Sequence, residues 1–281
     1  MRERLSRFTS DGLVFDVHDE GPLDGPVVVA LHGFPQTAAC WSSVIPRLVQ
    51  AGYRVLAPDQ RGYSPGARPR EVRAYAMRSL CADVLALADA AGVDRFHLLG
   101  HDWGASVGWV LAGRFPGRVR TLSAVSVPHP AALARALSGT QALRSWYIAM
   151  FQVPGLAERL FAARDGALVR RLLAGSGMAD PEPSVRLLTD RSAATATLNW
   201  YRALRLRGGL TAGRTSVPTL YVWSDGDVAL GRRAAEATAD YVRGPYRFEV
   251  LAGVSHWVPE ERPAELAALV LDHLAEHPLD R

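Results

Sequence analysis

The 281-residue chain contains no lysine, and all 32 residues counted as Lys+Arg are arginines. Enzymes that hold a substrate or PLP as a lysine Schiff base, and P-loop proteins, need a lysine amine, so these classes are excluded. The 28 acidic residues leave a net charge of +4, and the arginines are scattered singly or in short pairs. Because nucleic-acid-binding surfaces cluster their basic residues, we expect no nucleic-acid partner.

Cysteine and long apolar runs are also scarce. Cys40 and Cys81 are far apart, which excludes a CxxC redox pair, a zinc finger and a disulfide framework. No apolar run approaches the roughly 20 residues of a membrane span, and the N-terminus lacks the apolar core of a signal peptide. There is no HExxH motif and no GxGxxG after a strand, so we expect neither a metal nor an organic cofactor. We expect a cytoplasmic protein of ordinary enzyme size.

Short β-branched runs alternate with helical patterns in two parts of the chain. Strands are expected at residues 26–31, 53–58, 95–100, 119–127, 219–223 and 246–251, after an edge hairpin over residues 5–17. Helices are expected over residues 77–91, 103–114 and 263–274, where apolar residues recur in steps of three and four. Strands that alternate with helices indicate a mostly parallel sheet flanked by helices.

The alternation stops after Val127. From His129 to about Gly213 the sequence predicts helices and no strand, at residues 130–137, 141–151, 154–163, 166–174, 183–190 and 194–204. A linker rich in Gly and Thr follows at residues 207–216. We therefore expect an α/β core formed by residues 1–128 and 214–281, interrupted by an all-helical domain of residues 129–213.

A G-x-D-x-G sequence joins one expected strand to the next helix and centres on Asp102. Glycines two residues before and after permit a sharp turn that exposes the central side chain at the carboxyl end of the strand. A carboxylate is ionised at neutral pH and displaces well at saturated carbon, whereas its attack on an ester would give an anhydride. This favours epoxides or alkyl halides over esters and amides. The alternative is that Asp102 merely caps the helix.

Three further motifs follow expected strands. HGFPQ after the first core strand can aim the Phe34 N–H at the site, where it would form an oxyanion hole with the Trp103 N–H. WSDGD supplies Asp227, preferred to Asp225, as an acid that orients a histidine. GVSHW supplies His256, which has the right strand-end position late in the chain. The order nucleophile, acid, histidine is the order of an α/β-hydrolase.

These motifs, with DQRGY at 59–63 and VPHP at 127–130, resemble the epoxide hydrolase branch of the α/β-hydrolase superfamily over nearly the whole chain. The resemblance implies a cis peptide between Phe34 and Pro35 and a helical cap over the site. It also assigns two ring-opening tyrosines to Tyr147 and Tyr201. The physics agrees, since a tyrosine hydroxyl can protonate the alkoxide that ring opening creates. We expect the pocket to be lined by Phe34, Pro35, Trp103, His129, Phe151, Trp200 and Trp257.

The interpretation is an epoxide hydrolase that binds a small hydrophobic epoxide, forms a covalent ester on Asp102 and releases a vicinal diol with water activated by His256 and Asp227. The nearest alternative is a haloalkane or haloacid dehalogenase with the same nucleophile. Phe34 stands where haloalkane dehalogenases have a halide-binding asparagine, and Trp103 stands where fluoroacetate dehalogenases have an arginine. A serine-type esterase is disfavoured by Asp102. A non-catalytic binding protein is weakened because no catalytic position is missing. The oligomeric state stays open, a homodimer included.

Overall fold

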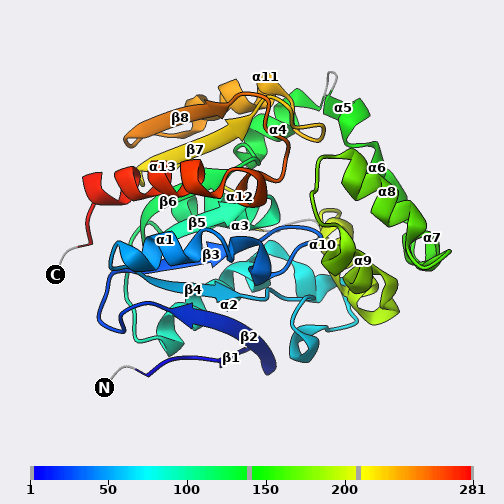
Figure 1. Cartoon of the computed structure of the whole chain (residues 1–281), viewed down its shortest axis with the longest axis horizontal. Coiled ribbons are helices and arrows are strands. Elements are labelled where there is room, and N and C mark those ends of the chain that lie inside the picture. Colours follow the sequence, from blue (N-terminus) through cyan, green and yellow to red (C-terminus); the bar gives the residue numbers. More distant parts are fainter. Residues whose placement is uncertain (1–2, 138–140, 207–209, 280–281) are drawn as a thin grey trace.

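The computed structural model describes residues 3–137, 141–206 and 210–279. One eight-stranded sheet forms its centre, in the order β1-β2-β4-β3-β5-β6-β7-β8 (Figure 1). β2 pairs antiparallel with β1 and β4, and the other neighbouring strands are parallel. The strands are β1 (Arg7–Ser10), β2 (Leu13–Glu20), β3 (Val27–Leu31), β4 (Arg54–Pro58), β5 (Phe96–His101), β6 (Val119–Val125), β7 (Thr219–Ser224) and β8 (Tyr246–Leu251). The expected edge hairpin and mostly parallel sheet are confirmed.

The central strands are buried on both faces, as runs of Val, Leu and Ala predict for a parallel sheet. Every residue of β3, β4, β5 and β7 is buried. In β3, Val27, Val29 and Leu31 join one hydrophobic cluster, while Val28 and Ala30 join the other. This period of two divides the core into a layer on each side of the sheet.

Helices cover both faces of the sheet (Figure 1). α2 (Met77–Ala90) and α3 (Trp103–Arg114) pack against each other, and α3 lies on β5 and β6. On the other face, α13 (Pro263–Glu276) contacts β6 and β7 and packs against α1 (Ile45–Gln50) and α12 (Val258–Glu261). Outside residues 129–213, the described chain also contains α11 (Arg232–Glu236) and four 3-10 helices, η1 (Ala38–Trp41), η2 (Pro65–Ala67), η3 (Val72–Tyr75) and η4 (Ala237–Tyr241).

Seven helices lie between β6 and β7 in the described chain: α4 (Pro130–Ala136), α5 (Gln141–Arg144), α6 (Trp146–Phe151), α7 (Leu156–Ala162), α8 (Ala167–Gly175), α9 (Glu182–Thr189) and α10 (Arg191–Ala203). The helix expected over 141–151 is divided at Ser145. α10 begins three residues earlier than expected, because Asp190 Oδ1 accepts the Ala193 N–H at 2.8 Å and caps it. Part of the expected linker, residues 207–209, lies outside the described residues.

The inserted helices meet the α/β part at both of their ends. α4 packs on α11 and η4, and α10 packs on η3 as well as on α6, α7 and α9. Figure 1 shows α6 to α10 beside the carboxyl ends of the parallel strands, where ligands bind in open α/β folds. In the described part of the chain, no helix combines the length and the apolar character that crossing a membrane requires.

Candidate active site

Asp102 stands at the sharp turn between β5 and α3, as the G-x-D-x-G pattern predicts. Its backbone has φ 52° and ψ −117°, a conformation that costs a non-glycine residue roughly 1–3 kcal/mol. The flanking glycines are required by space. A Cβ on Gly104 would lie 2.1 Å from the Leu31 carbonyl oxygen, and one on Gly100 would lie 2.5 Å from the Gly104 carbonyl oxygen. The close approach of α3 to β3 and β5 therefore fixes both glycines and presents the Asp102 carboxylate.

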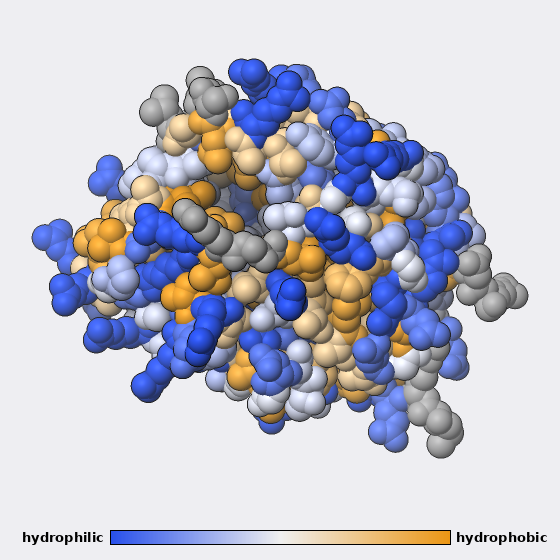
Figure 2. Space-filling model, turned by 180° about the vertical axis from the view of Figure 1, so that it is seen from behind, coloured by the Kyte–Doolittle hydropathy of each residue, from blue (hydrophilic) through white to orange (hydrophobic). Residues whose placement is uncertain are grey.

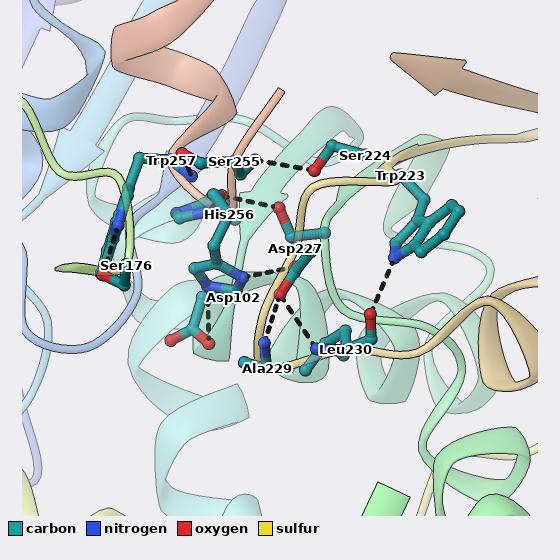
Figure 3. A network of polar contacts seen from close by, with 12 residues as sticks. Asp102, Ser176, Trp223, Ser224, Asp227, Ala229, Leu230, Ser255, His256 and Trp257 are labelled. Carbon is teal, nitrogen blue, oxygen red and sulfur yellow. Dashed lines mark hydrogen bonds and ion pairs between the residues drawn. The ribbon is translucent and has the colours of Figure 1, made fainter. Parts of the chain in front are cut away.

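His256 lies between two carboxylates (Figure 3). Its Nδ1 is 2.7 Å from Asp227 Oδ2, and its Nε2 is 3.5 Å from Asp102 Oδ2. The other oxygen of Asp227 accepts the N–H groups of Ala229 and Leu230 at 2.7 and 2.9 Å. With its carboxylate held on both sides and no exposed side-chain surface, Asp227 fixes the ring of His256 and keeps its Nε2 turned to Asp102.

The two carboxylates also set the charge of the histidine. Burial alone would lower the pKa of His256, but the charges of Asp227 and Asp102 and their contacts with the ring raise it to about 10. Burial alone would raise the pKa of Asp102, but its contact with His256 and the N–H of Phe34 lower it. At neutral pH the site therefore holds an imidazolium between two carboxylates.

Two hydrogen bonds to its carbonyl oxygen hold the backbone of His256 in place. Its carbonyl oxygen accepts hydrogen bonds from His101 Nε2 at 2.9 Å and from Ser126 Oγ at 3.0 Å. Burial, followed by the charge of His256, lowers the pKa of His101 to about 4, so His101 is a neutral donor. Asp225, the alternative acid, is exposed and accepts the Gly253 N–H at 2.7 Å instead of contacting the histidine. The geometry therefore brings Asp227, and not Asp225, to His256.

The Phe34 N–H donates to Asp102 Oδ1 at 2.7 Å. Gly33 makes this approach possible, because a Cβ there would lie 2.2 Å from the Cβ of Asp102. The peptide between Phe34 and Pro35 is cis, as the resemblance implies. The Trp103 N–H, in the first turn of α3, has no hydrogen-bond acceptor within the described chain. One of the two expected oxyanion donors thus already contacts the carboxylate, and the other is unengaged.

Tyr147 and Tyr201 approach the site from the inserted helices. Their ring centroids are 6.2 Å apart, and the Tyr201 ring packs edge-on against Phe34 and Phe151. Burial, then the neighbouring Asp102 charge, raises the pKa of Tyr147. Burial, then the Tyr147 and Asp102 groups, raises the pKa of Tyr201 well above its ordinary value. Both side chains therefore stay protonated as donors far into the alkaline range.

A cavity of about 440 Å³ joins these groups. Asp102, His256, Tyr147 and Tyr201 all line it, and so do four of the residues expected in the pocket, namely Phe34, Pro35, Phe151 and Trp257. The remaining wall is mainly apolar and comes from α6, α7, α8 and α9 through Trp146, Met150, Phe161, Val169, Leu172, Leu173 and Leu188. Seen from behind, the surface of the protein is hollowed, with hydrophobic residues gathered beside the opening (Figure 2). The cavity suits an apolar molecule with one reactive polar centre.

Three residues expected in the pocket lie elsewhere. His129 caps α4 by accepting the Ala131 N–H, and its ring stacks on Tyr241 at a centroid distance of 4.5 Å. Trp200 is buried and donates from its indole to the Arg61 carbonyl oxygen at 2.7 Å. Trp103 packs edge-on between Trp200 and Tyr201 and does not line the cavity. The expectation was wrong for these three because their side chains are committed to packing between the insertion and the core.

Several polar residues around the site were not predicted from the sequence. Ser126, which donates a hydrogen bond to the His256 carbonyl oxygen, belongs to none of the sequence motifs. Ser176, between α8 and α9, accepts the indole N–H of Trp257 at 3.0 Å. Arg144 lines the cavity and donates to the Asp227 carbonyl oxygen at 2.7 Å. No local pattern marks Ser176 or Arg144, because both reach the site through the packing of short helices.

One group of side chains in the described part of the chain is spaced closely enough to share a metal ion. It consists of His273, Glu276 and His277 on and after α13. His273 already contacts the Pro218 carbonyl oxygen at 3.3 Å, at the amino end of β7. The carboxylates and histidine around the cavity lie at the opposite ends of the strands. The candidate active site therefore has no direct link to this group.

The comparisons with known proteins agree with this geometry. The sequence model described as alpha/beta hydrolase fold matches residues 26–263. The chain is 34% identical to epoxide hydrolase A of Mycobacterium tuberculosis, over 94% of this chain and 95% of that one. It is also 34% identical to the AB hydrolase superfamily protein YfhM of Bacillus subtilis, over 94% and 96%.

Solved structures give the same result. The crystal structure of epoxide hydrolase A from Mycobacterium thermoresistibile matches with a TM-score of 0.83 and 31% identity, and the match covers all of both chains. Its fold is thus that of the present chain from end to end. The chain belongs to the α/β-hydrolase superfamily and, within it, to the epoxide hydrolase family.

Proposed function

We propose that this protein hydrolyses an epoxide to a vicinal diol through a covalent ester on Asp102. One observation carries the proposal. The ionised Asp102 carboxylate, whose side chain is 16% exposed, lines an apolar cavity together with His256, which Asp227 holds, and two protonated tyrosines from the inserted helices. Each group has a role in one half of an epoxide hydrolysis. The relatives and solved structures named as epoxide hydrolases support the same substrate class.

In the first half, Tyr147 and Tyr201 donate hydrogen bonds to the epoxide oxygen. Oδ2 of Asp102 attacks a ring carbon from the opposite side, and the C–O bond of the ring breaks. A tyrosine transfers its proton to the oxygen as the bond breaks and is left as a tyrosinate, so that no free alkoxide forms. The Tyr201 ring packs edge-on against Trp103, which helps to hold the side chain in place.

In the second half, water attacks the carboxyl carbon of the ester. His256 takes a proton from this water through Nε2, while Asp227 holds the ring by Nδ1. The negative charge collects on Oδ1 of Asp102, which already accepts the Phe34 N–H. The Trp103 N–H supplies a second donor as the charge develops. The intermediate then collapses and the ester C–O bond breaks. The diol oxygen takes the proton from His256, and the carboxylic acid left on Asp102 passes its own proton to His256, which restores the carboxylate.

Alkylation itself prepares the histidine for this role. In the resting site two carboxylates raise the pKa of His256 to about 10, which favours the cation. The ester removes the negative charge of Asp102, 3.5 Å from Nε2, while the charge of Asp227 remains. The pKa of His256 therefore falls when the ester forms. Its proton returns to the tyrosinate left by ring opening, and the neutral base becomes available for the hydrolysis step.

Dehalogenation is the second candidate, because it uses the same carboxylate and the same hydrolysis step. A departing halide needs N–H donors aimed at it, not a transferable proton. The Trp103 indole packs against Tyr201 and does not line the cavity, and the Phe34 side chain offers no donor. Two protonated tyrosines that line the same cavity as the Asp102 carboxylate match an oxygen leaving group. The site therefore favours epoxides.

The test uses a variant that can form the ester on Asp102 but cannot hydrolyse it. His256→Ala, incubated with a panel of aryl and alkyl epoxides, is expected to gain the mass of one epoxide on Asp102 and then stall. The wild-type protein is expected to form diol, with no chloride or bromide released from matched halides. His18→Ala, an exposed histidine on β2, serves as the control and should turn over normally. Release of halide with no diol would favour the dehalogenase, and no adduct with any epoxide would refute the proposal.

We also propose that residues 129–213 act as a cap over the active site. The cap is attached to the core where α4 packs against α11 and η4. The cap would contribute the two tyrosines and most of the apolar wall. A cytoplasmic location and a homodimer stay predictions, checked by fractionation and by the mass of the protein in solution.

A further inference from the structure

We propose that Arg144 is a specificity residue that selects epoxides carrying a carboxylate on the part of the molecule remote from the ring. The inference rests on the proposed function and narrows its substrate class. Among the described residues that line the cavity, the charged side chains are Asp102, His256 and Arg144. The first two have partners and roles in the reaction, whereas Arg144 has no role in either half of it.

Arg144 is available to a ligand. Its side chain is exposed at the edge of the cavity, next to Trp146, which is 59% exposed. The contact found for its guanidinium is the hydrogen bond from Nη1 to the Asp227 carbonyl oxygen at 2.7 Å. Within the described chain no carboxylate pairs with it, so a guanidinium with several N–H donors borders an otherwise apolar wall.

Hydrogen bonds hold α5, the helix that carries Arg144, against the core. Gln141, one turn earlier on α5, donates to the Ala229 carbonyl oxygen at 2.7 Å and accepts the Gly231 N–H at 2.9 Å. These bonds tie α5 to the loop that follows β7, and Ala229 lines the cavity beside Val228. The guanidinium is therefore positioned before a substrate arrives, which reduces the entropy lost when an anion binds.

The charge distribution supports an anionic substrate. Residues 129–213 contain 11 arginines and 5 acidic residues, a net charge of +6. The other residues contain 21 arginines and 23 acidic residues, a net charge of −2. The whole positive excess of the chain thus lies on the segment that supplies most of the cavity wall. Such a field attracts anions, and a planar guanidinium gives a carboxylate a specific partner.

The test compares two epoxides of one shape. One is a straight-chain terminal epoxide with a carboxylate at its far end, and the other is the matching primary amide. The wild-type protein is expected to show the higher kcat/KM with the carboxylate. Arg144→Gln should lower the carboxylate-to-amide ratio of kcat/KM about tenfold, the size expected for a charge-assisted bond at a partly exposed site. Arg144→Lys keeps the cation and should retain most of the preference.

Arg159→Gln is the matched control, because Arg159 is an exposed arginine of the same segment that does not line the cavity. It should change the ratio less than twofold. If Arg144→Gln lowers kcat/KM equally for both epoxides, Arg144 acts only through its bond to the Asp227 loop and the inference is wrong. It is equally wrong if the wild-type protein prefers the amide.

A measurement of ligand binding tests this inference independently of the proposed function. In protein carrying Asp102→Asn, which cannot form the ester, adding Arg144→Gln should weaken carboxylate binding about tenfold and amide binding less than twofold. If no epoxide is converted by wild-type protein, the proposed function fails while this binding measurement still tests Arg144. Equal weakening for both compounds would overturn the inference even where diol is formed.

Discussion

The α/β core and the inserted helices divide the chemistry between them by charge. The core supplies Asp102, Asp227 and His256, which follow parallel strands whose positions the sheet fixes. Asp227 and His256 are buried, and the Asp102 side chain is 16% exposed. The insertion supplies neutral hydroxyls and an apolar wall from short helices. Charged groups need a rigid scaffold, because an unpaired buried charge costs several kcal/mol. Apolar walls tolerate variation, so the insertion is free to set the substrate.

The largest expected effect comes from the acid of the core. Asp227→Asn should lower kcat about 10³- to 10⁴-fold, because the histidine loses both its orientation and the charge that keeps it basic. The ester on Asp102 should accumulate, as seen by intact mass after rapid quenching. Asp225→Asn is the matched control on the same loop and should stay within a few-fold of wild type. Similar losses in both variants would contradict the assignment of Asp227.

Next come the hydroxyls of the insertion. Tyr147→Phe and Tyr201→Phe should each lower the alkylation rate about 10²-fold, and the double variant should lose far more, because no proton donor remains for the leaving oxygen. Single-turnover kinetics would measure this step. Hydrolysis of an ester already formed should change little. Loss of hydrolysis with normal alkylation would contradict the division between the two regions.

The insertion also holds a buried ion pair whose loss should affect stability and not chemistry. Arg202 lies 2.9 Å from Glu158 and donates to the Phe151 carbonyl oxygen at 3.0 Å. Arg202→Met leaves the Glu158 charge buried and should cost about 3 kcal/mol. Chemical denaturation measures the loss, with exposed Arg205→Met as the control near zero. An equal effect of the two variants would show that the pair contributes nothing.

The smallest effect is a change of rate-limiting step with pH. The pKa of Asp102 is lowered, so alkylation should persist below the ordinary range of an aspartate. Both tyrosines have raised pKa values, so alkylation should also persist at alkaline pH. Hydrolysis needs neutral His256 and should slow as pH falls through the pKa that His256 has in the ester. Quenched samples should hold more ester at pH 5 than at pH 9, and the reverse would contradict the charge argument.

The sequence predicted the core site more fully than the insertion, for a physical reason. Parallel strands end on one edge of the sheet, so motifs that follow strands must meet there, as Asp102, Asp227 and His256 do. Short helices carry no such rule. His129 and Trp200 were misplaced because a buried aromatic looks the same whether it packs in an interface or lines a cavity.

The polar groups of the insertion were harder still to predict. Gln141 holds α5, and with it Arg144, through hydrogen bonds to Ala229 and Gly231, which lie about ninety residues further along the chain. Tyr147 and Tyr201 were found by resemblance and not by periodicity. Their helices place them beside each other only through tertiary packing.

The central claim is the covalent ester on Asp102. A single turnover of excess protein with an epoxide in water enriched in heavy oxygen tests it most directly, with the label located by peptide mass analysis and in the diol. Because water attacks the carboxyl carbon, the label should enter the Asp102 carboxylate while the first diol stays unlabelled. Label in the first diol with none on Asp102 would mean that water opens the ring directly, which would contradict the account.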